Sequence, residues 1–287
     1  MVIDVHVHPA YCADICTDPA RSNRRWDELG YHLMSPSPLE SLDRQNAYAG
    51  IDKMVLLPLD HSTRCGEVIL SNEEIKLLVD KRPETFIGFA SVDPRRPDAA
   101  AVLNHAFGEL GLRGLKLNPA KQRFYPDDRA LMWPIYEKCL EYGRPILFHA
   151  GLSWEPGTLA KYAHPLRFEE VALEFPALRL CLAHFGWPWV QDTAMLLIKY
   201  ENVYADTAMN YMDSAPQFFQ KVFRQDMGEY WLDHNFARKV LFGSNSPRFR
   251  PLVIKRGLDA LPMREETRRL VYGENALRFL GLQGDDA

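Results

Sequence analysis

Four histidines stand at the ends of short apolar segments, in a pattern that suits metal binding. His6 and His8 close the opening segment, His149 ends Pro145-Ile-Leu-Phe-His149, and His184 ends Leu180-Cys-Leu-Ala-His184. Neutral imidazole is a strong ligand for zinc and its neighbours. A single histidine at the end of a strand is a hydrogen-bonded structural residue about as often as it is a metal ligand. Four of them at the same end of parallel strands would otherwise repel one another or lack partners, so together they predict a site for one divalent metal ion.

The opening segment, Ile3-Asp-Val-His-Val-His8, alternates apolar and polar residues. Side chains alternate across a strand, so Asp4, His6 and His8 are expected to share one face. The apolar residues between them are expected to pack under outer helices. The polar face would then point inward, with the two histidines nearest the mouth of the fold.

Short apolar runs and longer amphipathic stretches alternate along the chain, which is the pattern of parallel strands covered by helices. The predicted strands are 2–6, 53–57, 86–91, 114–117, 145–149, 179–184, 202–206 and 239–244. The predicted helices are 39–49, 71–81, 98–110, 128–142, 165–175, 188–200, 214–227, 251–260 and 264–280. Eight such units close an α/β barrel, and polar residues at the strand ends favour this over an open doubly wound sheet.

Composition is typical of a soluble globular protein, and no break in it divides residues 1–287 into more than one domain. The chain has 287 residues, 47% apolar and 25% charged, with a net charge of −4, so a nucleic-acid partner is not expected. No apolar run is long enough to cross a bilayer, and no signal peptide is evident, so we expect a cytoplasmic protein with no membrane partner. Five scattered cysteines fit a reducing compartment, and Cys12 and Cys16 lack the second pair that a zinc site needs.

Two segments lie outside the repeating units. Residues 9–37 are expected to form a long loop after the first strand, and its aromatic residues Tyr11, Trp26 and Tyr31 favour a packed lid over a plain surface loop. Residues 264–287 are expected to form an extra C-terminal helix and tail.

Six short motifs together resemble the amidohydrolase superfamily, in its amidohydrolase-related (amidohydrolase 2) branch. That branch includes aminocarboxymuconate-semialdehyde decarboxylase, resorcylate decarboxylases and lactone hydrolases. The resemblance extends over nearly the whole chain, and its motifs in order are Asp4-x-His-x-His8, Gly114-Leu-Lys-Leu117, Leu147-Phe-His149, Ala183-His-Phe-Gly186, Val203-Tyr-Ala-Asp206 and Leu241-Phe-Gly-Ser-Asn-Ser-Pro247.

The resemblance implies a distorted (β/α)8 barrel with one divalent metal, usually Zn²⁺, with Mn²⁺ as the alternative. His6, His8 and His149 match metal ligands, and His184 matches the catalytic histidine beside the metal-bound water. Relatives are commonly dimers, so the resemblance also implies a homodimer.

Asn245 occupies the position of the fourth family ligand, which is an aspartate that also handles the proton of the water. An amide oxygen can ligate a metal, but asparagine supplies neither negative charge nor a general base. Three explanations stay open. His184 acts as the base alone, another carboxylate such as Asp206 or Glu155 reaches the metal, or activity is lost, which includes deliberate replacement of a natural aspartate.

Further side chains are expected around this centre. Lys116 shares the inward face of its strand, where it could contact substrate, form a structural ion pair or, as a carboxylated lysine, bridge two metals. Trp154 and Arg248 are expected to bind substrate, since an aromatic ring and a guanidinium suit a flat carboxylate. Asp4 and Asp206 are expected to support the metal ligands from behind.

These residues suit three functions. The first is a metal-dependent hydrolase of a small, carboxylate-bearing amide, ester or lactone, in which the metal activates water. The second is a metal-dependent, non-oxidative decarboxylase of an aromatic or unsaturated acid. The third is a barrel that binds its small-molecule ligand without turnover, which only Asn245 supports.

Overall fold

The barrel strands of the structure follow the predicted order. The structure is a computed structural model that describes residues 1–31 and 34–282. Its barrel strands are β1 (Ile3–Val7), β2 (Lys53–Leu56), β5 (Phe86–Gly88), β6 (Ala90–Ser91), β7 (Leu115–Leu117), β8 (Ile146–Phe148), β9 (Leu180–Leu182), β10 (Val203–Asp206) and β11 (Val240–Leu241). Each of these strands pairs in parallel with its neighbours, in the orders β1-β2-β5 and β6-β7-β8-β9-β10-β11.

Backbone hydrogen bonds join the two sheets into a closed barrel. β5 and β6 are the two parts of the predicted strand 86–91, and between them the Phe89 N–H donates to Leu56 O at 3.0 Å. At the other junction the Val5 N–H donates to Phe242 O at 3.0 Å, and the His8 N–H donates to Ser246 O at 2.8 Å. The prediction of an α/β barrel is therefore confirmed, and an open sheet is excluded.

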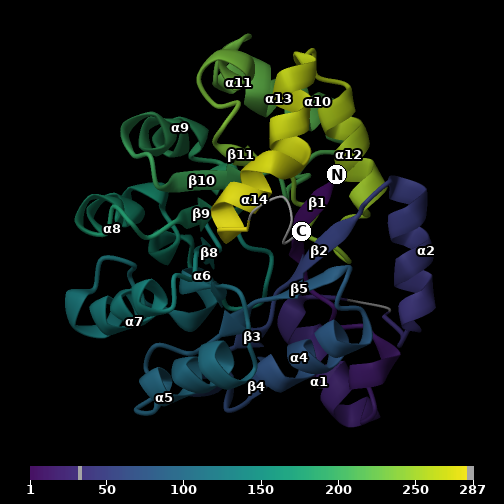
Figure 1. Ribbon diagram of the computed structural model, residues 1–287, viewed down its shortest axis with the longest axis vertical. Coiled ribbons are helices and arrows are strands. Elements are labelled where there is room, and N and C mark those ends of the chain that lie inside the picture. The colour runs from purple at the N-terminus through teal and green to yellow at the C-terminus, as the bar shows by residue number, and fades with distance from the viewer. Residues whose placement is uncertain (32–33, 283–287) are drawn as a thin grey trace.

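Helices surround the strands on the outside of the barrel (Figure 1). The longer ones are α2 (Leu39–Ala49), α4 (Asn72–Lys81), α7 (Arg129–Glu141), α9 (Val190–Lys199) and α12 (Pro251–Asp259). Shorter ones are α3 (Ser62–Cys65), α5 (Ala99–Asn104), α6 (Pro119–Gln122), α8 (Glu169–Glu174), α10 (Ala215–Gln220), α11 (Trp231–His234), α13 (Glu265–Arg269) and α14 (Asn275–Leu280). Wider π-helical turns extend α5 and α10 and join α13 to α14, so the predicted helices 98–110, 214–227 and 264–280 are each continuous but not uniform.

The C-terminal helix α14 closes the N-terminal end of the barrel. Figure 1 shows α14 across the middle of the barrel, beside the start of β1. Ala276 and Phe279 of α14 pack in one apolar cluster with side chains from several strands, among them Val55, Leu147 and Leu241. Strands on opposite sides of a barrel share such a cluster only in its interior, so this cluster is the floor beneath the polar site.

The expected orientation of Ile3 and Val5 is wrong. Both side chains belong to the interior cluster with α14 rather than to the shell under the outer helices. The register of β1 against β2 shifts between Asp4 and Val7. An irregularity of this kind re-aims the side chains that follow it, so strict alternation does not hold through to Val7, although Ile3 precedes the shift.

The expected loop 9–37 is also wrong in its middle, where α1 (Pro19–Leu29) forms. Asp18 caps the helix by accepting from the backbone N–H groups of Ala20 and Arg21, and Gly30 ends it at φ 65°. Trp26 lies on the buried face and donates from Nε1 to Ala10 O at 2.9 Å. Helix α1 is therefore packed against the rest of the fold through its buried face. A small antiparallel pair, β3 (Leu59–Asp60) and β4 (Val68–Leu70), was also missed.

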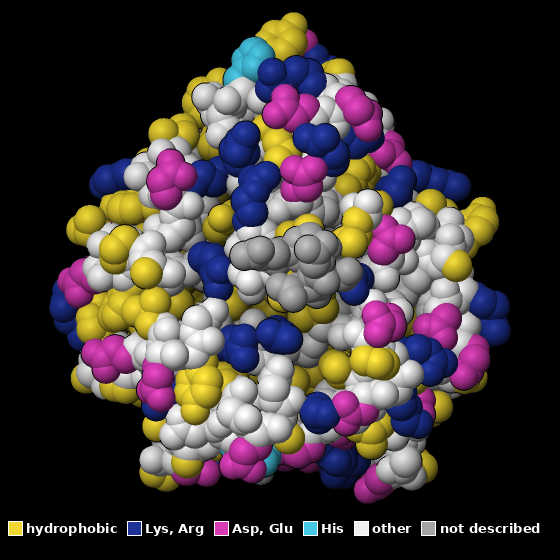
Figure 2. Space-filling view, viewed as in Figure 1, with side chains coloured by type: hydrophobic (Ala, Val, Ile, Leu, Met, Phe, Trp, Pro, Cys, Tyr) yellow, Lys and Arg dark blue, Asp and Glu magenta, His cyan; other side chains and the backbone are white. Residues whose placement is uncertain are grey.

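The surface seen in Figure 2 mixes basic and acidic side chains over the end of the barrel that α14 covers. Among the described residues, no helix combines the length and the apolar character that crossing a bilayer requires.

Candidate metal centre

Four imidazole rings converge at the C-terminal end of the barrel strands. The ring centroid of His6 lies 5.2 Å from that of His8 and 5.0 Å from that of His184, and His184 lies 4.8 Å from His149. All four side chains are buried. The structure thus brings together the four histidines that the sequence singled out.

Hydrogen bonds fix which nitrogen of His6 and His8 faces the pocket. His6 Nδ1 lies 2.7 Å from Asp206 Oδ2, and His8 Nδ1 lies 3.2 Å from Leu57 O. A carboxylate and a carbonyl only accept, so each Nδ1 carries the proton and donates. The Nε2 lone pairs of both rings are therefore free, which is the arrangement that metal-binding histidines adopt.

A second chain of hydrogen bonds frees the same atom of His149. His184 Nδ1 lies 2.6 Å from Ala208 O and must donate, so its Nε2 accepts from His149 Nδ1 at 3.1 Å. His149 Nε2 then holds a lone pair, and this buried atom has no hydrogen-bond partner among the described residues. An orphaned imidazole nitrogen in the interior is the position that a metal ion would satisfy.

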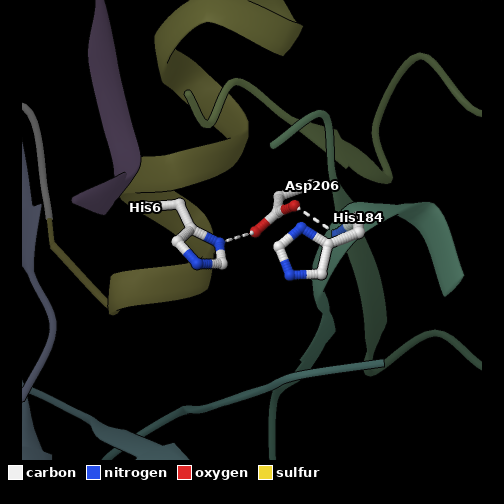
Figure 3. A group of neighbouring side chains, drawn as sticks. All are labelled: His6, His184 and Asp206. Atoms are coloured by element: carbon white, nitrogen blue, oxygen red, sulfur yellow. Dashed lines mark hydrogen bonds and ion pairs between the residues drawn. The ribbon is translucent and has the colours of Figure 1, made fainter. Parts of the chain in front are cut away.

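Asp206 links the hydrogen bonds of His6 to those of His184 (Figure 3). Its Oδ2 accepts from His6, while its Oδ1 accepts from the backbone N–H groups of His184 at 2.7 Å and Ala208 at 3.0 Å. His6, His184 and Asp206 also offer ligand atoms within 4.8 Å of one another. Because these three hydrogen bonds already engage both carboxylate oxygens, the geometry suits orientation of the rings better than direct ligation.

Burial keeps the rings neutral, as ligands must be. Burial lowers the pKa of His6, His8 and His149 well below the usual value, and the charge of Lys116 adds to this effect. Burial likewise lowers the pKa of His184 to about 3. Three neutral imidazoles with free Nε2 atoms form a donor set that fits a divalent transition metal.

Unusual backbone conformations aim two of these residues. His184 and Phe185 adopt φ values of 60° and 47° and are followed by Gly186 at 60°, so the chain turns sharply straight after β9. Asn245 adopts φ 61°, and its N–H donates to His6 O at 2.9 Å. Strained left-handed residues gather at functional sites, and here they place the His184 ring and the Asn245 side chain at the rim.

Asp4 lies behind the centre and contacts no histidine ring. Its carboxylate accepts from the N–H and the hydroxyl of Ser244 and from the backbone N–H of His6. Burial raises the pKa of Asp4 to about 7, although the hydrogen bonds to Ser244 and His6 oppose this shift. Asp4 thus ties β1 to the segment after β11, where Asn245 follows.

A pocket opens beside the histidines and gathers the predicted substrate residues Lys116, Trp154 and Arg248. Lys116 is 1% exposed, and its Nζ has no hydrogen-bond partner among the described residues. Arg248 lies over the rings of Tyr31 and Trp154, at 5.0 and 5.7 Å from their centroids. The lining residues are His6, His8, Tyr31, Lys116, Asn118, His149, Leu152, Ser153, Trp154, Glu155, His184, Tyr211, Asn245 and Arg248.

Two basic side chains fasten the pocket walls. The fully buried Lys121 Nζ donates to Pro156 O at 2.8 Å and lies 2.7 Å from Glu28 Oε2. Arg248 donates from Nη2 to Leu29 O at 2.6 Å. Helix α1 and the segment after β8 are thereby held together over the pocket.

Sequence reasoning missed several parts of the site. Asn118, Leu152 and Ser153 line the pocket, but only Asn118 carried a signal, since it shares a strand face with Lys116. The carbonyls of Leu57 and Ala208 that orient His8 and His184 have no side-chain signature. Cys12 and Cys16 are buried free thiols, and the described residues place no ligand cluster there.

Lys116→Met is expected to stabilise the metal-free protein at neutral pH. Burial lowers the pKa of Lys116 to about 8, while the nearby carboxylates Asp206 and Glu155 oppose this shift. Between pH 8 and about pH 10.4 the unfolded chain binds more protons than the folded chain. The free energy of unfolding of the wild type therefore rises with pH across that window. Below pH 8 the buried charge lowers the free energy of unfolding by its full amount, about 3 kcal/mol.

Urea unfolding at pH 7 and pH 9.5 checks this expectation. The free energy of unfolding of Lys116→Met should exceed that of wild type at pH 7, and the gap should narrow at pH 9.5. Lys161→Met, at an exposed lysine beside the same barrel end, serves as the control. A gap that stays constant across the two pH values would contradict the assignment.

Comparisons with known proteins agree with the fold. The amidohydrolase family model matches residues 3–282. An uncharacterised TIM-barrel protein from Bordetella bronchiseptica is similar over 98% of both chains, at 24% identity and a TM-score of 0.75. No protein of curated function matches the sequence.

Two enzymes are also similar in structure. A dihydroxybenzoic acid decarboxylase from a Polaromonas species, with bound manganese and the inhibitor 2-nitroresorcinol, matches at 20% identity and a TM-score of 0.67, over 99% of this chain and 98% of the other. A 4-oxalomesaconate hydratase from Rhodopseudomonas palustris matches at 21% identity and a TM-score of 0.63, over 98% and 96%. At these identities the likeness shows the TIM-barrel fold. The family match extends over nearly the whole sequence, and the chain therefore belongs to the amidohydrolase family.

Proposed function

We propose that the protein is a metal-dependent, non-oxidative decarboxylase of a small aromatic or unsaturated carboxylic acid. The observation that carries this proposal is the pairing of two cationic side chains, Lys116 and Arg248, with three free imidazole nitrogens in one pocket. Among the described residues, neither Lys116 nor Arg248 has a carboxylate oxygen within 4.0 Å. The ion pairs near the pocket join other side chains, such as Arg64 with Glu28, Arg96 with Asp60 and Lys121 with Glu28. An anionic substrate would supply the missing partner.

In this proposal His6, His8 and His149 hold a divalent ion through Nε2, and the amide oxygen of Asn245 completes the set. Zinc suits three imidazoles, and manganese is the metal in the similar Polaromonas decarboxylase. When bound, the ion would act as a Lewis acid that grips and polarises an oxygen of the substrate.

The side chains of the pocket would orient the acid. Lys116 and Arg248 donate hydrogen bonds to its anionic group, and charge-assisted bonds of this kind are about twice as strong as neutral ones. Tyr31, Trp154 and Tyr211 offer ring faces for a flat body. Loss of CO2 leaves an electron pair on carbon that must take a proton, and the ammonium group of Lys116 is a lining group able to supply one.

Two considerations favour decarboxylation over the hydrolysis that the sequence suggested first. Hydrolysis needs a base to activate water, yet the position of the family's proton-handling aspartate carries Asn245, which is not a base, and Asp206 is engaged by three hydrogen bonds. A decarboxylase is also among the proteins of similar structure, alongside a hydratase. Decarboxylation needs no base for water, so an asparagine at position 245 does not remove a required group.

A CO2-release assay tests the proposal. Protein loaded with zinc or with manganese is incubated with a panel of aromatic and α,β-unsaturated carboxylic acids, and released CO2 and product are measured. We expect at least one acid to lose CO2, and we expect His149→Ala to abolish that activity. Hydrolysis of amides, esters or lactones by the same protein would overturn the proposal, as would binding of the acids without release of CO2.

A further inference from the structure

Glu155 is the one carboxylate among the described residues that line the pocket. It lies in the segment that follows β8, and its Oε2 accepts from Asn118 Nδ2 at 3.0 Å. The described residues place no basic group within 4.0 Å of it, because Lys121 pairs with Glu28 instead. Lys116 in the same pocket likewise has no partner. Opposite charges therefore face the same space without forming an ion pair.

The segment around Glu155 is held in place, so the position of its carboxylate is defined. The Glu155 N–H donates to Ser153 Oγ at 3.2 Å, and Thr158 Oγ1 donates to Glu155 O at 3.0 Å. The next residue, Pro156, accepts from the fully buried Lys121. A carboxylate carried on this fixed turn and held by Asn118 Nδ2 can discriminate between ligands, since these contacts restrain it when a ligand fails to match it.

Glu155 is also set apart from the histidine centre. Among the described residues, Glu155 makes no hydrogen bond to any of the four histidines, and its one side-chain partner is Asn118. One oxygen of Glu155 is engaged by Asn118, and the other has no donor among the described residues. This free oxygen can accept one more hydrogen bond from a group that enters the pocket.

We infer that Glu155 is a specificity-determining residue that selects acids with a hydroxyl or amino hydrogen-bond donor on the ring or chain, away from the carboxylate. This inference rests on the proposed function, because it assumes that an acid occupies the pocket. Lys116 and Arg248 bind the carboxylate, and Glu155 accepts from the donor. A ligand without the donor leaves a desolvated carboxylate unpaired, whereas a second carboxylate at that end meets like charge.

Isothermal titration of metal-loaded protein tests this with benzoate, 3- and 4-hydroxybenzoate, 3- and 4-aminobenzoate and isophthalate as probes. In wild type we expect at least one donor-bearing acid to bind about 10- to 100-fold more tightly than benzoate, as a charge-assisted hydrogen bond predicts. Glu155→Met should reduce that ratio to below about threefold, and Glu155→Gln should retain part of it because its amide oxygen still accepts. Isophthalate should bind more tightly to Glu155→Gln than to wild type.

Glu137→Gln, at an exposed glutamate of α7, is the matched control and should leave every ratio unchanged. Thermal unfolding of each variant verifies that the chain is folded. Equal binding of benzoate and the donor-bearing acids by wild type would overturn the inference, as would an unchanged preference in Glu155→Met. Binding does not require turnover, so a donor preference without CO2 release would overturn the proposed function and leave the role of Glu155 standing.

Discussion

His149→Ala is expected to abolish stoichiometric metal binding and to reduce turnover at least about 1000-fold, since the ion, when bound, would supply the Lewis acidity that the reaction needs. His149 Nε2 is buried and has no partner among the described residues. Removing the ring deletes one of three imidazole ligands, and it also leaves His184 Nε2 without its donor. Metal content after dialysis and kcat on an acid that releases CO2 measure the two effects.

His105→Ala is the matched control, because His105 is a half-exposed histidine that pairs with Glu109 far from the pocket. It should retain full metal content and activity. Full metal occupancy in His149→Ala would contradict the proposed ligand set. Normal occupancy with lost turnover would instead assign His149 to the chemical step alone.

The convergence of the histidines was predictable because it depends on features that a sequence records directly. His149 and His184 follow apolar runs that fold as β8 and β9, and parallel strands present their C-terminal ends at one rim. The choice between hydrolysis and decarboxylation was not predictable from the same residues. Both reactions use a metal held by histidines, and the difference lies in how a small substrate is placed.

Features that depend on tertiary contacts escaped sequence reasoning. The capping residues of α1, Asp18 and Gly30, were present, but the buried face of that polar helix includes Ser22 and Arg25, so few apolar residues mark it. Ile3 and Val5 belong to the interior cluster with α14, and alternation alone does not reveal which face of a strand turns inward. The free nitrogen of His8 depends on the carbonyl of Leu57, which no side-chain pattern marks.

Asn245→Asp is expected to raise metal affinity about 10- to 100-fold, equivalent to about 1.4–2.8 kcal/mol. The proposed ligands are three neutral imidazoles and an amide, so the 2+ charge of the ion is not compensated by any ligand. A carboxylate at this position adds direct attraction, which its desolvation partly offsets. Asn245 adopts φ 61°, and aspartate tolerates this left-handed conformation about as well as asparagine, so the backbone should not change.

The turnover of Asn245→Asp separates the explanations for the asparagine. Competition with a chelator measures affinity, and CO2 release with saturating metal measures turnover. Tighter metal binding with unchanged or lower turnover would mean that the neutral Asn245 suits the native reaction. A neutral ligand leaves the ion more electrophilic than a carboxylate does, and a more electrophilic ion would bind the acid more strongly. A large gain in turnover would mean that the native centre is weakened, and new hydrolytic activity would show that the missing base had excluded hydrolysis. Unchanged affinity would place Asn245 outside the ligand set and leave the ion to the three histidines.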